Sequence, residues 1–171
     1  LASTVLDVAA THGDAALYDR YQEQLRRLSG QPEAYYRFFG ALTWFRDPAL
    51  VQRTLDFALS RDVRTQDTGR LIGGLLSRPW SRDAAWTFVT SRWDTLTERL
   101  GTFQGIPAIV GNLGNFCSRE KASEVRAFFD QHAAPAVART LRQSIERIET
   151  CAAVAARQSP AAATWLAAAA P

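Results

Sequence analysis

The chain has 171 residues, of which 47% are hydrophobic and 22% are charged, and it carries a formal net charge of +3. These values are ordinary for a globular protein and fit one domain or one long helical array. No uncharged apolar run reaches the roughly 18 residues that a membrane span requires, and the basic residues form no stripe that would favour nucleic acid.

The first 60 residues predict four helices, because apolar residues recur at intervals of three and four. The first run lies near Thr4 to Ala10. Asp14 is suited to cap a second helix, since its carboxylate can accept hydrogen bonds from the free amides of a helix start. Ser29-Gly30 ends that helix, and Pro32 opens a third. Asp47-Pro48 places a capping residue and a first-turn proline at the start of a fourth.

The middle of the chain predicts two further helices, separated by a turn at Arg78-Pro79. The first runs from Gln66 to Ser77, and Ser81 is positioned to cap the second. We expect a break near Asp94. The apolar stripe of this region consists of Trp86, Val89, Trp93, Leu96 and Leu100. Gly69, Gly73 and Gly74 form no phosphate loop, since the GxxxxGK motif is absent. Small residues spaced four apart instead predict the close approach of another helix.

The last third predicts a linker and four more helices. The expected segments are a linker at Gly101–Gly105, then helices at Ile106–Leu113, Arg119–Gln131, Pro135 to about Gln158, and Ala161–Ala168. Ser118 is suited to cap the second of these helices. We expect Trp165 and Leu166 to dock on the preceding helix.

About ten short-linked helices predict an all-α fold of antiparallel helix pairs. Units of roughly 35 to 45 residues favour an irregular HEAT- or armadillo-like superhelix. We expect residues 1–171 to form a single domain. The chain contains no methionine, so we expect it to be a fragment or a processed product of a longer protein.

No catalytic metal or nucleophile is predicted. His12 and His132 lack the HExxH context of a zinc site. Cys117 precedes a helix start that would favour a thiolate, but His132 lies at the far end of the same helix, ~20 Å away. Whether Cys117 and Cys151 form a disulfide is an open question at this point, and so is the cellular compartment of the chain. We expect Cys151 to be a small core residue.

One helix start is a candidate binding site. Arg64 and Gln66 flank the start of the helix, and Arg70 lies one turn further. Free amides and the positive end of the helix dipole suit a carboxylate, which arginine binds through two parallel hydrogen bonds. The alternative is a solvated helix start with local salt bridges, such as one from Arg70 to Asp67.

Several segments share an order with a known family. They are Tyr36–Asp47, Val63-Arg64-Thr65-Gln66-Asp67, Arg78-Pro79, Ala85-Trp86-x-Phe88, Trp93-x-x-Leu96, Phe116-Cys117-Ser118, Leu141–Glu149 and Trp165-Leu166. Together they resemble the C-terminal helical domain of the gluzincin zinc aminopeptidases, the M1 family. Each motif alone is common, but the ordered set is specific. The chain departs from the family in its alanine-rich tail and in Gly73-Gly74.

The resemblance implies a helical superhelix that packs on the catalytic domain of its own parent chain and closes a chamber around the active site. Zinc would belong to that catalytic domain, so the resemblance implies no catalytic residue, metal or cofactor in this chain. The concave side of such a domain can contact the distal end of a peptide substrate. By resemblance, Arg64 and Gln66 fall in the contact segment, whereas Arg70 rests on spacing alone.

Two other functions stay open at this point. The first is a free-standing HEAT-like scaffold that binds a partner protein. The second is a hydrolase that uses Cys117.

Overall fold

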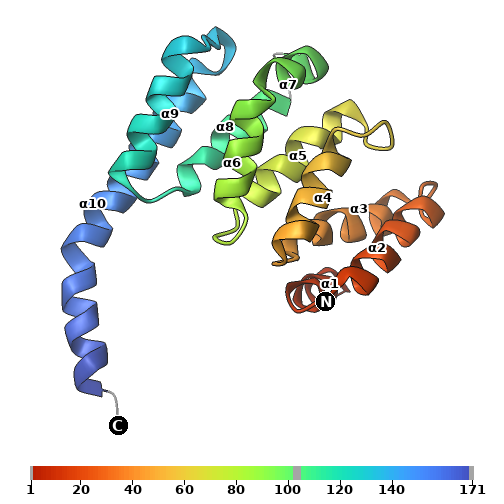
Figure 1. Ribbon diagram of the computed structural model, residues 1–171, viewed down its shortest axis with the longest axis horizontal. Helices are drawn as coiled ribbons and strands as arrows, with labels where there is room; N and C mark the ends of the chain where they lie inside the picture. Colours follow the sequence, from red (N-terminus) through yellow and green to blue (C-terminus); the bar gives the residue numbers. More distant parts are fainter. Residues whose placement is uncertain (1, 102–104, 170–171) are drawn as a thin grey trace. The chain divides into compact units, whose positions relative to one another are not determined.

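The computed structural model describes residues 2–101 and 105–169, and every regular element in these ranges is a helix (Figure 1). This confirms the predicted all-α class. The expected linker lies mostly outside the described residues. No helix in the described ranges is long and apolar enough to cross a membrane. The chain forms two compact units, one up to Ile109 and one from Val110 onwards. The single-domain boundaries and the HEAT-like superhelix stay predictions.

The first unit is a succession of helices that pack on their neighbours in the chain (Figure 1). They are α1 (Ala2–Thr11), α2 (Ala15–Arg27), α3 (Pro32–Ala41), η1 (Leu42–Trp44), α4 (Pro48–Ala58), α5 (Thr65–Leu76), α6 (Arg82–Ser91), α7 (Trp93–Leu100) and the start of α8 (Ile106–Asn112). α3 packs on α1 and α2, and α5 packs on α4, α6 and α7. The central helix α5 therefore has neighbours on several sides.

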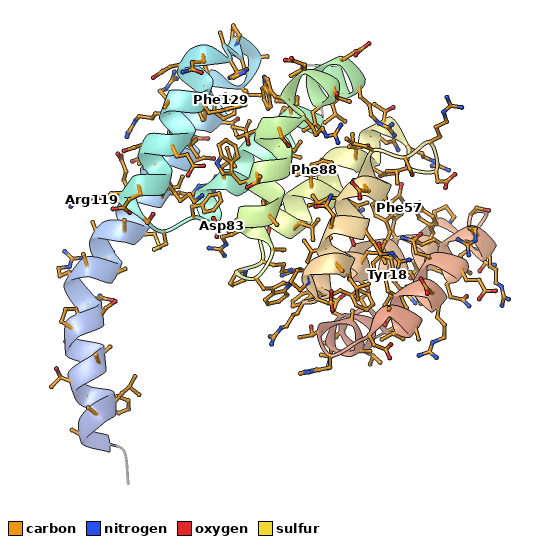
Figure 2. All side chains as sticks on the ribbon, viewed as in Figure 1. Tyr18, Phe57, Asp83, Phe88, Arg119 and Phe129 are labelled. Carbon is orange, nitrogen blue, oxygen red and sulfur yellow. A yellow bond between two sulfur atoms is a disulfide. The ribbon has the colours of Figure 1, made fainter. Side chains whose placement is uncertain are left out.

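Side chains fill the space between the helices of the first unit (Figure 2). The predicted stripe is buried, with Trp86 1% exposed and Val89 and Leu96 fully covered. Tyr18 of α2 is also buried, and its hydroxyl shares a hydrogen bond of 3.1 Å with Thr54 of α4. This unit thus has an aromatic core rather than a purely aliphatic one.

Two of the predicted helix caps in this unit are confirmed, and one is wrong. The Asp14 carboxylate accepts from the amide of Leu17 at 2.9 Å, and that of Asp47 accepts from Ala49 at 2.8 Å. Ser81 stands at the N-cap of α6, but its hydroxyl donates instead to the Leu75 carbonyl at 2.7 Å. Its backbone is helical rather than extended, and its side chain is fully buried against the end of α5.

The glycines of α5 permit close approach, as predicted. A Cβ added at Gly69 would lie 2.6 Å from the Gly105 carbonyl oxygen, and one at Gly74 would lie 2.8 Å from Cγ2 of Thr43. Gly69 therefore lies against backbone, where no side chain could move aside to make room.

The second unit contains η3 (Leu113–Asn115), α9 (Arg119–Gln131), η4 (Pro135–Val137) and α10 (Ala138–Ala169). Ser118 caps α9 as predicted, accepting from the Lys121 amide at 3.2 Å. The separate last helix was wrong, because α10 continues through Pro160. Proline removes one hydrogen bond from the helix, but the flanking alanines have the highest helix propensity. Trp165 and Leu166 do not dock on a neighbour, since they are 69% and 61% exposed.

A disulfide joins Cys117 to Cys151, with a Cα–Cα distance of 5.0 Å. It links the residue before the α9 cap to α10, and it removes Cys117 as a candidate nucleophile. The prediction of a core position for Cys151 was wrong, because the residue is exposed. The buried residues of α10 here are Ile148 and Ala152, and Cys151 lies off their stripe.

Candidate functional site

The loop that leads into α5 is fixed by one side chain from α7. The guanidinium of Arg99 donates to the carbonyls of Leu59, Ser60 and Val63 at 2.7, 2.7 and 2.8 Å. The Thr68 hydroxyl adds a hydrogen bond of 2.9 Å to the carbonyl of Ala58. The start of α5 is therefore held to the end of α4 from two directions.

Arg64, Gln66 and Arg70, which the sequence offers as a candidate binding site, are all exposed around the first two turns of α5. Arg64 is the N-cap residue, and no side chain caps this helix. Asp67, by contrast, is only 6% exposed. The helix start thus presents basic and amide groups outward while its acidic residue faces the protein.

Tyr36 of α3 connects Asp67 to Arg70. Its hydroxyl lies 3.1 and 3.0 Å from the two carboxylate oxygens of Asp67, to which it donates. The Arg70 guanidinium lies over the Tyr36 ring, 5.0 Å from the ring centre. The expected alternative of a salt bridge between Arg70 and Asp67 is not found among the described residues, because the aromatic side chain occupies the place between them.

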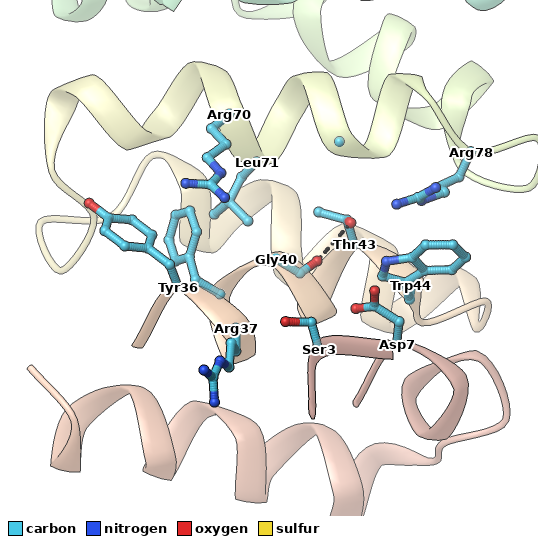
Figure 3. A pocket seen from close by; sticks show the side chains of 12 residues that line it. Ser3, Asp7, Tyr36, Arg37, Gly40, Thr43, Trp44, Arg70, Leu71 and Arg78 are labelled. Carbon is cyan, nitrogen blue, oxygen red and sulfur yellow. Dashed lines mark hydrogen bonds between the residues drawn. The ribbon is translucent and has the colours of Figure 1, made fainter. Parts of the chain in front are cut away.

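The three predicted residues do not line one cavity. Arg70 lines a cavity of about 300 Å³ between α1, α3, η1 and α5 (Figure 3). Arg64 lines a smaller cavity of about 110 Å³ beside the α4–α5 loop. Tyr36 lines both cavities, and Gln66 lines neither. The structure therefore places Arg64 and Arg70 next to two cavities that share Tyr36.

The larger cavity contains charged residues that sequence reasoning missed as site residues. Arg78 stacks over the Trp44 ring, with Cζ 3.4 Å from the ring centre, and Arg37 pairs with Glu33. Asp7 enters from α1. Burial raises the pKa of the Asp7 carboxyl, against the opposing charge of Arg78, and burial lowers the pKa of Arg78.

No local signal in the sequence could have found this set. Asp7 lies on α1 and Arg78 lies in the turn between α5 and α6, far apart in the chain, and Arg78 is marked only by the proline that follows it. Their meeting depends on the packing of α1 and α5 around α3 and η1, which periodicity alone does not predict.

Metal binding has no support in the described residues, which contain no cluster of three or more His, Cys, Asp or Glu side chains able to hold an ion. His132 ends α9, where its ring stacks on Phe128 at 4.2 Å between ring centres.

Comparison with known proteins assigns the chain to a family. A family model described as "ERAP1-like C-terminal domain" matches residues 1–150. The chain belongs to this family. The match confirms the resemblance found in the sequence, and it ends just before Cys151 and the exposed part of α10.

Named relatives of this ERAP1-like domain are aminopeptidases. Aminopeptidase M1 of Arabidopsis thaliana is 39% identical over 114 residues, which cover 66% of this chain and 13% of that protein. Aminopeptidase M1-C of Oryza sativa subsp. japonica is 31% identical over 123 residues, covering 71% of this chain and 14% of that protein. The mitochondrial aminopeptidase 2 of Saccharomyces cerevisiae is 28% identical over 148 residues, which cover 84% of this chain and 15% of that protein. The ERAP1-like domain thus spans a small part of the length of these relatives.

Proposed function

We propose that this domain is the non-catalytic C-terminal part of a zinc-dependent aminopeptidase. It packs on the catalytic domain of its own parent chain and shapes or gates the chamber that a peptide substrate enters. The observation that carries the proposal is the match of residues 1–150 to a C-terminal domain whose named relatives are aminopeptidases. The missing HExxH motif is consistent with hydrolysis elsewhere in the parent protein.

Peptide contact is proposed for the start of α5. Arg64 and Arg70 are exposed, and neither forms a hydrogen bond or ion pair through its guanidinium within the described residues. Both can therefore offer paired donors to a carboxylate of a peptide. Gln66 adds an amide between them. The hydrogen bonds from Arg99 to the loop before α5 support this role, because a recognition surface is more selective when its backbone is held in place.

The test uses the full-length parent enzyme with Arg64→Gln and Arg70→Gln together. Loss of contacts to a peptide carboxylate should cost about 1 kcal/mol, a roughly fivefold rise in KM for a long peptide. The KM for a short aminoacyl-anilide should not change, because that substrate does not reach the distal contact. Arg61→Gln is the matched control, since Arg61 is exposed and lines neither cavity.

Two results would contradict the proposal. An equal rise in KM for both substrates would show that the arginines act on the enzyme as a whole rather than on the distal end of a peptide. Zinc-dependent turnover of the anilide by the isolated 171-residue chain would show that the domain is itself catalytic. The free-standing scaffold would gain support if the chain bound a partner protein without any catalytic domain.

A further inference from the structure

The cavity between α1, α3, η1 and α5 has charged groups of both signs around a single hollow (Figure 3). Arg70 and Arg78 reach it from α5 and its C-terminal end, and Asp7 and Ser3 reach it from α1. Its volume of about 300 Å³ lies at the lower end of the range for small-molecule sites. This size suits a small molecule rather than a folded partner.

Two of the cationic groups are held in a fixed plane by aromatic rings. Arg70 lies over Tyr36 and Arg78 lies over Trp44. Stacking of this kind orients a guanidinium while leaving its edge N–H groups available to an acceptor. The Nε of Arg78 is buried and has no hydrogen-bond partner among the described residues. A buried donor without a partner is unfavourable, and it marks Arg78 as a side chain whose hydrogen bonds are not all satisfied inside the protein.

The acidic group makes the cavity unsuited to a simple anion. The Asp7 carboxylate lines the same hollow and forms no hydrogen bond or ion pair with another described residue. It would repel a phosphate or a plain dicarboxylate, and it would attract an ammonium group. Arg37 does not alter this balance, because its charge is already paired with Glu33.

Asp7 and Arg78 attract each other through space, but no direct ion pair joins them among the described residues, and Arg70 forms none either. The described lining therefore offers two cations and one anion that a ligand placed between them can contact. Their complement is a molecule with two carboxylates and one ammonium group. We propose that this cavity binds a free α-amino acid with an acidic side chain, whose carboxylates contact Arg70 and Arg78 and whose ammonium group contacts Asp7. This proposal shares Arg70 with the proposed peptide contact, but the two can be tested separately, because only the amino-acid site requires Asp7 and Arg78.

The first test compares ligands on the unchanged chain by isothermal titration calorimetry at constant ionic strength. L-glutamate should bind at least tenfold more tightly than glutarate, which lacks the ammonium group, and than L-glutamine, which lacks the second carboxylate. The indole N–H resonance of Trp44 should shift with glutamate. Equal binding of glutarate would show a simple anion site and overturn the proposal, as would the absence of glutamate binding at millimolar concentration.

The second test uses matched variants of the same chain. Asp7→Asn and Arg78→Gln should each weaken glutamate binding at least tenfold, whereas Asp130→Asn and Arg61→Gln should leave it unchanged, since both control residues are exposed and lie outside the cavity. Circular dichroism checks that each variant is folded. Unchanged binding in a folded Asp7→Asn variant would overturn the assignment. The ligand series on the unchanged chain decides the matter if a variant fails to fold.

Discussion

Helix α5 and the last part of α10 are both rich in small residues, but these residues stabilise the two helices in different ways. In α5, Gly69 and Gly74 let a backbone segment and a threonine side chain approach more closely than a Cβ at either position would permit. In α10, the described alanines after Ala152 are mostly exposed, so this part of the helix relies on its own propensity more than on burial. Small residues therefore mark either close packing or intrinsic helicity, and only the tertiary neighbours distinguish the two.

The disulfide lies where α10 changes from a helix packed on its neighbours to a mostly exposed helix. Before Cys151, the helix is held by a hydrogen bond of 2.8 Å from Ser144 to the Val110 carbonyl and by an ion pair of 2.7 Å between Arg126 and Glu149. After it, Ala152 is the last residue with a buried side chain. The covalent link thus closes the packed part of the second unit.

Removal of this link is expected to have the largest effect. The cysteines are 34 positions apart. The loop-entropy model gives ~3–4 kcal/mol of stabilisation for a loop of this length. Cys117→Ser with Cys151→Ser should therefore lower the free energy of unfolding of the second unit by about that amount. Urea denaturation followed by the circular dichroism signal measures the change. Dithiothreitol should destabilise the unchanged chain and leave the double variant unaffected. If dithiothreitol does not change the stability of the unchanged chain, the stabilising role of this disulfide is wrong.

A methyl group added to α5 should have the next largest effect. Gly69→Ala places a Cβ 2.6 Å from the carbonyl oxygen and 2.7 Å from the Cα of Gly105. This overpacking against backbone should cost about 2 kcal/mol in urea denaturation.

The same substitution at Gly40 of α3 is the matched control. A Cβ there has nothing within 4 Å, so Gly40→Ala should be neutral or stabilise by roughly 0.5–1 kcal/mol through helix propensity. A neutral Gly69→Ala variant would show that α5 does not depend on its close contact.

The exposed end of α10 should contribute least. Trp165 is 69% exposed, so Trp165→Ala should change the free energy of unfolding by less than ~0.5 kcal/mol. Removal of all residues after Gln158 should have an equally small effect on the unfolding of the rest. A loss comparable to that at Gly69 would mean that Trp165 packs on the protein in solution.

Sequence reasoning was accurate where the signal is local. The caps at Asp14, Asp47 and Ser118 are short-range patterns of one residue and the amides after it, and all three are present. It failed at Ser81, because burial against Leu75 turned the hydroxyl to another acceptor. A local pattern identifies a capping residue but not the competing partner that the fold supplies.

The candidate site shows the same division. The place of Arg64 and Arg70 near a helix start follows from local sequence signals and was predicted, and both side chains are exposed there. The contacts of Tyr36 with Arg70 and Asp67 were not predicted, because Tyr36 belongs to another helix, α3. Asp7 and Arg78 were missed for the same reason, since no motif relates them in the chain.

The clamp formed by Arg99 has a mechanical consequence. One planar group grips three carbonyls spread over the α4–α5 loop, so this loop is a rigid extension of α7 rather than an independent hinge. A tilt of α7 against α5 would pull on Val63 and, through the adjoining peptide, on Arg64. The start of α5 is thus tied to α7 in two ways, by the packing of the two helices and by the hydrogen bonds of Arg99 to the preceding loop.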